Sequence, residues 1–355
     1  MTVKESRVFY LNQQTEGLPN VELGEPNSTF RLVTEELQPL KENEVLVKSL
    51  YFSNDPLQLG WIRKASYENA GIRRIFPGEP MGGFGLGQVI ESTADQYKPG
   101  DIVNGALNWA DYSIVKAGAL TGKIPDSSLP LTTSLSTIGL TGLTGYFGIY
   151  GQVKEGDTVI VSAASGATGL VAVQVAKALG CRVVGITGSD EKCKFVVGLG
   201  ADACVNYNDP ELIEKLKQAL GEKGTCDFFY DTVGGELLDK VMTLMTKNGL
   251  ILVVGAISGF KDVTKMYVKN WPQVIASRLT IKGFIVSDYL HKVEEARVNL
   301  TKWIQEGKIR NDSSVLNVID LTEESKFADI PKAWALILDE NKKPGKVLTK
   351  LADPE

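Results

Sequence analysis

Small residues follow an apolar run at 158–164 and precede a segment with the apolar period of a helix. Positions 164–169 read A-S-G-A-T-G, a G-x-G-x-x-G pattern with alanine in its first place. Small side chains there let the backbone approach a pyrophosphate and let the helix pack tightly on its strand. The amides at the helix start, beyond Gly166, offer partial positive charge to a phosphate. The pattern favours a dinucleotide-binding turn over a purely structural one.

The next strand-like segment indicates which dinucleotide is bound. Sites for NAD usually place a carboxylate about 20 residues further on, where it holds the ribose 2′-hydroxyl. Here segment 182–186 runs into Thr187, Gly188 and Ser189, with no acid at its tip. Ser189 and Lys192 are suited to a 2′-phosphate, and Asp190 is read as a first-turn acid that complements the helix dipole. We therefore expect NADP(H) as cofactor; the alternative for Lys192 is an ordinary solvated lysine.

Composition limits the classes of protein that fit. The chain has 355 residues, enough for two domains, with 43% apolar and 23% charged residues and a net charge of −5. It has no basic run, no apolar stretch of about 18 residues and no signal-peptide core. We expect no nucleic-acid or membrane partner and a cytoplasmic location. The four cysteines, none in a C-x-x-C pair, are expected to be reduced and mostly buried.

The pattern of predicted strands and helices changes at about residue 130. Before it, short strands and loops rich in Gly and Pro predominate; after it, strands alternate with helices, as in a parallel doubly wound sheet. Asp209 and Pro210 predict the cap and first position of a further helix. The predicted strands of the second part are 158–164, 182–186, 203–207, 226–233, 249–255 and 279–286, and its helices include 167–179 and 291–306. The expected fold class is α/β.

Several motifs resemble one known family. They include NDP at 54–56, GFGLGQVIES at 83–92, the specific run 161–192, and FFYDTVGGELLD at 228–239. On these, the chain resembles the zinc-independent medium-chain dehydrogenase/reductase superfamily. Within it, the chain looks most like the branch of leukotriene B4 12-hydroxydehydrogenase/prostaglandin reductases and NADPH-dependent alkenal double-bond reductases. Zinc-dependent relatives carry Cys and His ligands in the first domain, and this chain has neither before residue 181, so no metal is expected.

The resemblance implies a domain arrangement and a set of cofactor contacts. A β-rich, GroES-like catalytic domain would comprise 1–128 and 312–355, and a Rossmann NADP(H)-binding domain 129–311. It also implies a homodimer, with the strand at 279–286 at the sheet edge. The implied cofactor residues are Asn54, Gly166, Ala167, Thr168, Gly169, Gly188, Ser189, Lys192, Tyr207, Asp231, Gly255, Ala256, Ile257, Ser258, Phe284, Ile285, Val286 and Asn341.

The chemistry implied is reduction of the C=C bond of an α,β-unsaturated aldehyde or ketone. A hydride reaches the β-carbon, a proton reaches the α-carbon, and a donor stabilises the enolate-like oxygen. The small-molecule partner would be an electrophile with an activated double bond. Two positions depart from the family, because Leu57 and Phe260 stand where tyrosines are usual. The proton donor is therefore unassigned. The candidates are Tyr289, Ser258, Tyr51 and Tyr67.

Two other functions remain open from the sequence. A quinone or carbonyl reductase would use the same cofactor. A cofactor-binding sensor or structural protein with little catalysis fits the loss of both tyrosines.

Overall fold

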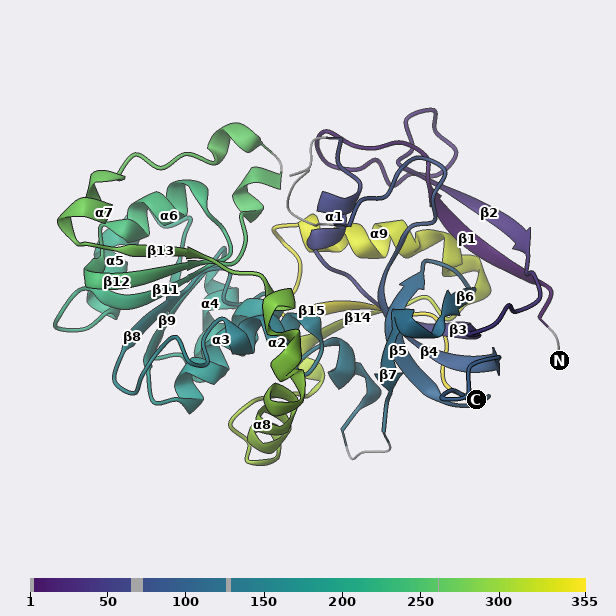
Figure 1. The fold of residues 1–355 in the computed structure, drawn as a ribbon. Helices are drawn as coiled ribbons and strands as arrows, with labels where there is room; N and C mark the ends of the chain where they lie inside the picture. The colour runs from purple at the N-terminus through teal and green to yellow at the C-terminus, as the bar shows by residue number, and fades with distance from the viewer. Residues whose placement is uncertain (1–2, 65–72, 126–128, 261) are drawn as a thin grey trace. The chain divides into compact units, whose positions relative to one another are not determined.

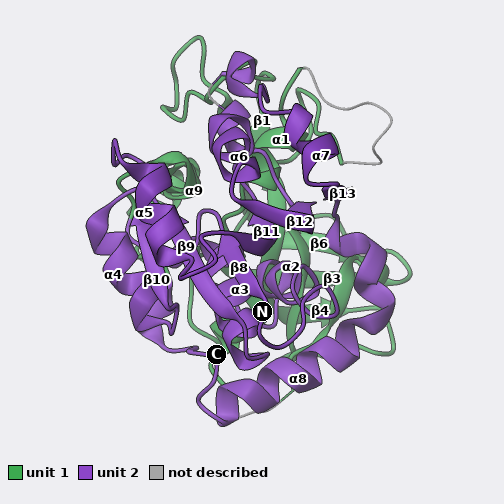
Figure 2. Ribbon diagram, turned by 90° about the vertical axis from the view of Figure 1, so that its left-hand side faces the viewer, with its two compact units in different colours: residues 1–135, 317–342, 347–355 green, residues 136–316, 343–346 purple. Residues whose placement is uncertain are grey.

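The chain folds into two compact units (Figure 2) in the computed structural model, which describes residues 3–64, 73–125, 129–260 and 262–355. Unit 1 comprises Met1–Leu135, Asn317–Lys342 and Val347–Glu355; unit 2 comprises Ser136–Leu316 and Lys343–Lys346. We predicted all of 312–355 in the first domain, whereas Lys343–Lys346 belong to unit 2. There the Gly345 amide donates to Ser165 O at 2.9 Å.

Unit 2 is built on a parallel sheet (Figure 1), and its strand order is β10-β9-β8-β11-β12-β13. Its strands are β8 (Thr158–Val161), β9 (Arg182–Thr187), β10 (Ala203–Asn206), β11 (Cys226–Asp231), β12 (Met245–Val253) and β13 (Thr280–Gly283). Its helices are α2 (Leu140–Phe147), α3 (Ala167–Ala178), α4 (Asp190–Gly198), α5 (Leu212–Ala219), α6 (Gly235–Met242), α7 (Pro272–Ala276) and α8 (Val293–Gln305). The strand order reverses between β8 and β11, and such switch points hold ligands in open α/β sheets.

Both faces of this sheet are buried, as its apolar strands predict. On β8, Val159 and Val161 pack into one core with residues of α2, α3 and α8, whereas Ile160 packs into a second core with residues of α5 and α6. Successive side chains of a strand point to opposite faces, so a strand covered on both sides must be apolar throughout. The prediction of an α/β fold with a doubly wound parallel sheet is confirmed.

Unit 1 is β-rich, also as expected. Its main sheet has the order β14-β15-β3-β4-β5-β7, with β6 paired to β3, and β1 and β2 form a separate antiparallel pair. The strands are β1 (Glu5–Leu11), β2 (Phe30–Glu36), β3 (Glu44–Ser53), β4 (Gly82–Ser92), β5 (Ile102–Asn108), β6 (Tyr112–Lys116), β7 (Leu120–Lys123), β14 (Leu316–Asp320) and β15 (Lys346–Lys350). Helices α1 (Leu57–Trp61) and α9 (Ile330–Ala335) complete it. Buried rings of Phe9, Phe30, Trp109 and Trp334 pack together in its core.

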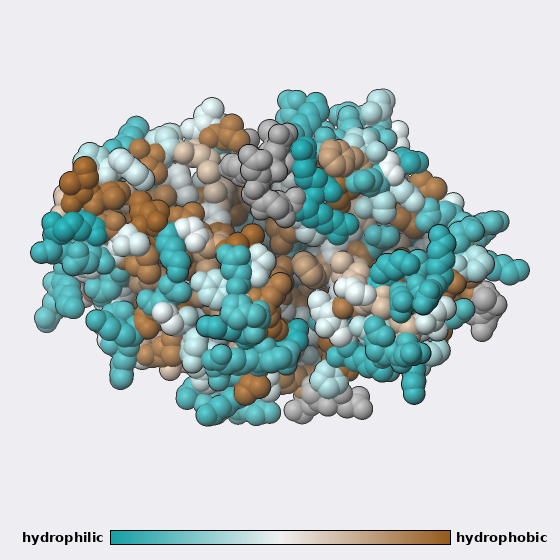
Figure 3. Space-filling model, viewed as in Figure 1, coloured by the Kyte–Doolittle hydropathy of each residue, from teal (hydrophilic) through white to brown (hydrophobic). Residues whose placement is uncertain are grey.

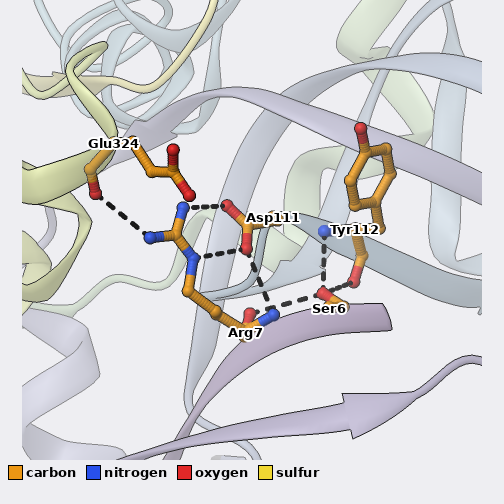
Figure 4. Close-up of polar contacts among 5 residues, drawn as sticks. All are labelled: Ser6, Arg7, Asp111, Tyr112 and Glu324. Atoms are coloured by element: carbon orange, nitrogen blue, oxygen red, sulfur yellow. Dashed lines mark hydrogen bonds and ion pairs between the residues drawn. The ribbon is translucent and has the colours of Figure 1, made fainter. Parts of the chain in front are cut away.

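A polar cluster attaches β1 to the rest of unit 1 (Figure 4). The Arg7 guanidinium donates from Nε and Nη2 to the two oxygens of Asp111 at 2.8 and 2.9 Å, and from Nη1 to Glu324 O at 3.1 Å. Ser6 Oγ donates to Tyr112 O at 2.9 Å and accepts from Tyr112 N at 3.0 Å. Because the Arg7 charge is already neutralised by a bidentate contact with the Asp111 carboxylate, we assign the cluster a structural role.

One predicted helix start is wrong. Helix α5 begins at Leu212 with Glu211 as its flanking residue, so Pro210 does not occupy its first position. Asp209 does act as a side-chain acceptor, but it bonds the amide of Glu211 at 2.9 Å in a turn before the helix. Such a turn uses the same Asp-Pro signal as a helix cap, since both place an acceptor two or three residues before a free amide.

Candidate functional site

The A-S-G-A-T-G segment connects the end of β8 to α3 at the switch point of the sheet. Ala163 has a positive φ of 45°, which turns the chain sharply. A Cβ on Gly169 would lie 2.4 Å from Ala163 O, so only glycine allows α3 to pack this closely. Gly166 precedes α3 and contributes no side-chain cap. The first amides of α3 are thereby left to an external acceptor, which is the property that a pyrophosphate site requires.

A buried polar network joins the ends of β8 and β11 beneath this turn. Ser162 and Asp231 are both fully buried, and Ser162 Oγ lies 3.2 Å from Asp231 Oδ1. Asp231 Oδ1 also accepts from the amides of Val233 at 2.9 Å and Gly234 at 3.0 Å. Ser162 Oγ in turn accepts from Thr232 N at 2.9 Å. Asp231, a predicted cofactor residue, therefore shapes the loop after β11.

The electrostatics of Asp231 follow from its position. Burial raises the pKa of Asp231 above its ordinary value, although the amides of Gly234 and Val233 and the Ser162 hydroxyl lower the pKa again in part. Desolvation outweighs the hydrogen bonds because no cation is among the causes of the shift. Ionisation of Asp231 therefore lowers the stability of the folded state, and the hydrogen bonds offset this loss only in part.

The turn that follows β12 is attached to the same loop. Gly255 N donates to Asp231 O at 3.2 Å, and Ile257 N donates to Thr232 O at 3.1 Å. The Ser258 hydroxyl donates to Val233 O at 2.7 Å. The predicted cofactor turn, Gly255–Ser258, thus lies beside Asp231 at the carboxyl edge of the sheet. As a proton donor Ser258 is poorly placed, because its hydroxyl hydrogen is held by a backbone carbonyl.

The predicted 2′-phosphate residues meet at the ends of β9 and β10. Ser189 caps α4, since its Oγ accepts from Lys192 N at 3.2 Å. Tyr207 N donates to Thr187 O at 2.8 Å, which extends the β9–β10 pairing. A Cβ on Gly188 would lie 3.0 Å from the Tyr207 ring and hydroxyl. Gly188, Ser189, Lys192 and Tyr207, which are separate in sequence, thus form one corner of unit 2.

Sequence reasoning missed several polar residues that build this edge. Ser162 lies within the apolar run 158–164 of the sequence. Its position directly after β8 was the only signal that it could have a polar role at the strand end. Asn206 Nδ2 donates to Asp190 Oδ1 at 3.0 Å, which holds that acid toward β10. Asn208 Nδ2 donates to Gly188 O at 2.9 Å. The VNYND segment contains both asparagines, and its position at a strand end was the available signal.

The end of β13 leads into a stack of three aromatic rings. Phe284 N donates to Val253 O at 3.0 Å, so the segment starts at the same sheet edge. The Tyr289 ring stacks on Phe284 and on Phe147, each at a centroid distance of 5.2 Å. Its hydroxyl has no hydrogen-bond partner among the residues that the structure describes. Ile285 is 48% exposed and Val286 is half-buried, so the predicted contacts Phe284–Val286 differ in accessibility.

Four predicted residues lie elsewhere. Asn54 and Tyr51 belong to unit 1; Asn54 is buried and its Nδ2 donates to Thr349 Oγ1 at 2.9 Å. Asn341 is exposed in unit 1, where its amide donates to Asp339. Tyr67 lies outside the described residues. Tyr51 sits on β3, and burial raises the pKa of its hydroxyl above the ordinary value.

Across the described parts of the chain, no group of three or more His, Cys, Asp or Glu side chains is arranged to hold a metal ion. In the same residues, no helix is both long and apolar enough to cross a membrane.

Comparison with known proteins identifies the family. The protein YfmJ of Bacillus subtilis (strain 168) is 36% identical over 363 aligned positions, which cover 100% of both chains. Prostaglandin reductase 1 of Rattus norvegicus is 35% identical over 314 positions, covering 86% of this chain and 90% of the rat protein.

The chain belongs to the zinc-independent medium-chain dehydrogenase/reductase superfamily, in its prostaglandin reductase branch.

Other matches agree with this family. Its models match at residues 7–122, described as the N-terminal domain of oxidoreductase, and at 167–304, described as zinc-binding dehydrogenase. The crystal structure of CurA from Vibrio vulnificus in complex with NADPH has a TM-score of 0.84 and 28% identity, covering 98% of this chain and 100% of CurA. The family resemblance seen in the sequence is confirmed.

We predict that Lys192→Ala raises the KM for NADPH by roughly tenfold or more, because a hydrogen bond to a charged partner contributes about 1.5–3 kcal/mol. The KM for NADH should change little, since NADH has no 2′-phosphate. Steady-state kinetics with both cofactors measure this. The matched control is Lys194→Ala, which removes the same charge from an exposed position of α4. Equal effects of Lys192→Ala on both cofactors would exclude the phosphate contact.

A second prediction concerns the buried carboxylate. The ordinary pKa of an aspartate is 3.8, and that of Asp231 is raised in the fold. The contribution of Asp231 to the free energy of unfolding is therefore most favourable below pH 3.8. It is lost as the pH rises through the pKa of Asp231 in the folded protein. Thermal unfolding midpoints of the wild type, measured relative to Asp231→Asn, should fall with rising pH. Asp202→Asn is the control, for which the midpoint of the wild type relative to the variant should rise with pH. Burial of Asp202 acts against its ionisation, but the Val183 amide and Lys177 outweigh burial and lower the pKa of Asp202.

Proposed function

We propose that this chain is an NADPH-dependent reductase of the C=C bond of α,β-unsaturated aldehydes and ketones. The observation that carries the proposal is the similarity to prostaglandin reductase 1, which extends over 90% of the rat protein. Prostaglandin is the substrate named for the rat protein, and we do not assign it to this chain. We propose only that this chain reduces the same class of bond. The partner would be a small electrophile with an activated double bond. A cytoplasmic location remains a prediction.

The chain is an NADP(H)-dependent oxidoreductase. Its own residues fit the cofactor at both phosphate positions. The close approach of Gly169 to Ala163 O and the uncapped start of α3 suit a pyrophosphate. The β9 tip has Ser189 and Lys192 instead of a carboxylate, which suits a 2′-phosphate. Of the predicted contacts, those in unit 2 lie at the carboxyl edge of one sheet.

The protein's part in the reaction is positioning and proton supply. When bound, the reduced nicotinamide supplies the hydride to the β-carbon. The α3 amides would hold the central pyrophosphate of the dinucleotide, and the corner of Ser189, Lys192 and Tyr207 would hold the 2′-phosphate of its adenosine half. A hydrogen-bond donor must then polarise the carbonyl oxygen, and a proton must reach the α-carbon from a side chain, a ribose hydroxyl or water.

Tyr289 is our proposed donor. Its ring is fixed between Phe147 and Phe284, it follows a segment that begins at the carboxyl edge, and its hydroxyl has no partner among the described residues. Of the other candidates, Ser258 donates its hydroxyl hydrogen to Val233 O. A stacked phenol keeps a defined direction for its hydroxyl, which a proton donor requires.

We also propose a homodimer formed through β13. This strand ends the sheet of unit 2, so one row of its backbone groups has no strand beside it in the described chain. Exposed apolar residues gather on the preceding helix α7 (Figure 3), where Trp271 is 58% and Ile275 is 79% exposed. Pairing of two β13 strands would satisfy the edge and cover these side chains.

The reaction is tested by parallel turnover of a medium-chain 2-alkenal, a quinone and a saturated ketone with NADPH. We expect the alkenal to be consumed fastest, with one saturated aldehyde formed per NADPH. With NADPH deuterated at the reactive carbon, mass spectrometry should find deuterium at the β-carbon of the product. Turnover of the quinone alone would favour a quinone reductase. Tight NADPH binding with no turnover of any compound would favour a sensor.

Tyr289→Phe should lower kcat for the alkenal about a hundredfold or more, because general acid catalysis contributes about 10²–10⁴. The KM for NADPH should stay unchanged, since phenylalanine keeps the ring stack. Tyr150→Phe, which removes another tyrosine hydroxyl of unit 2, is the control and should keep wild-type kcat. A wild-type kcat in Tyr289→Phe would assign the proton to another source.

The dimer is tested by the double variant Trp271→Glu/Ile275→Glu, which introduces like charges on the α7 surface. Sedimentation should give a monomer, with the wild type a dimer at the same concentration. Val298→Glu, at another exposed apolar position of unit 2, should leave the dimer intact. A monomeric wild type would contradict the proposal.

A further inference from the structure

Two of the four cysteines lie together behind the Ser189–Lys192–Tyr207 corner. Cys193 is in the second turn of α4, and Cys204 is on β10. Thr187, at the end of β9, contacts both, with Oγ1 at 3.1 Å from Cys193 Sγ and 3.8 Å from Cys204 Sγ. Both sulfurs thus lie within contact distance of one oxygen atom. Three neighbouring elements therefore bring two sulfur atoms to one hydroxyl.

This pair differs from the other two cysteines in accessibility and in acidity. Cys181 and Cys226 are fully buried, and burial raises the pKa of both thiols, that of Cys181 to about 11. Cys193 and Cys204 are only partly buried, contrary to the expectation of mostly buried thiols. The hydrogen bond from Cys204 lowers the pKa of Cys193 to about 7; burial opposes this, and Thr187 assists it.

Reactivity follows from these facts. The thiolate is the nucleophile, so a thiol that ionises near neutral pH reacts with peroxides faster than a buried one. The same hydrogen bond raises the pKa of Cys204, which keeps its proton until it reacts. One sulfur is thus prepared to attack, and the other is next to it and able to resolve the product.

We propose that Cys193 and Cys204 form a peroxide-responsive modification site whose oxidation to a disulfide weakens NADPH binding. The Cys193 thiolate attacks the O–O bond of a hydroperoxide, giving a sulfenic acid and releasing the alcohol, or water, from the leaving oxygen. Cys204 sulfur then attacks the sulfenic sulfur, and its proton leaves with the hydroxyl as water. The two sulfurs lose two electrons and the peroxide gains them.

The disulfide affects the Ser189–Lys192–Tyr207 corner through both of its cysteines. Lys192 directly precedes Cys193, and its amide is the one capped by Ser189. Tyr207 follows the β10 strand that carries Cys204. The two cysteines are free in this structure, so a covalent S–S bond of about 2.05 Å must draw the start of α4 and β10 together. The effect on NADPH rests on the proposed 2′-phosphate site; formation of the disulfide does not.

The test uses the full-length protein treated with hydrogen peroxide. We expect two of the four thiols to be lost, a Cys193–Cys204 linkage in non-reducing peptide maps, and recovery with dithiothreitol. The Kd for NADPH, from fluorescence titration, should rise about tenfold or more, with a small change for NADH. Prior saturation with NADP⁺ should slow the thiol loss, because a coupling between two sites is reciprocal.

Variants separate the roles of the two sulfurs. Cys204→Ser should accumulate the sulfenic acid on Cys193, detected by a dimedone adduct, and Cys193→Ser should resist oxidation. The controls Cys181→Ser and Cys226→Ser should behave as the wild type. Loss of the buried thiols first, or a linkage between two chains, would overturn the proposal. A Cys193–Cys204 disulfide without any effect of NADP⁺ on its formation would retain the modification site and reject the cofactor coupling.

Discussion

The carboxylate of Asp231 is the group on which the carboxyl edge of the unit 2 sheet depends. It is removed from water between the ends of β8 and β11, so its oxygens must be satisfied by nearby donors. Ser162 Oγ and the amides of Val233 and Gly234 supply them. Because these donors come from two separate connections, satisfying one carboxylate fixes the β8–α3 turn and the loop after β11 together.

The other turns are added to this anchor by backbone hydrogen bonds. The turn after β12 bonds Asp231 O and Thr232 O, and the segment after β13 begins with a bond to Val253 O. These bonds hold the turns after β12 and β13 along the carboxyl edge. Their amides are used within the protein, so the partial positive charge for a phosphate comes from the uncapped start of α3.

The second corner, at β9 and β10, works differently. Ser189 uses its hydroxyl as an acceptor for the Lys192 amide, so one residue both starts α4 and presents a polar group at the strand tip. Behind it, Thr187 connects to the thiol pair, so the helix that carries Lys192 is coupled to a group whose chemistry depends on oxidants. We therefore propose that cofactor preference and thiol chemistry are properties of the same few residues.

The sequence by itself determined most of the elements and the small-residue turn between β8 and α3. Uninterrupted apolar runs identified the buried strands, and the A-S-G-A-T-G spacing identified the close approach of Gly169, because both depend on neighbours in the chain. It misjudged the start of α5, because Asp209 and Pro210 also suit an isolated turn. The role of Ser162, the stack of Tyr289 and the contact between Cys193 and Cys204 were decided only by the tertiary structure. Each joins residues from different elements, and the distance between such residues is set by how strands and helices pack, which the local pattern of side chains does not encode.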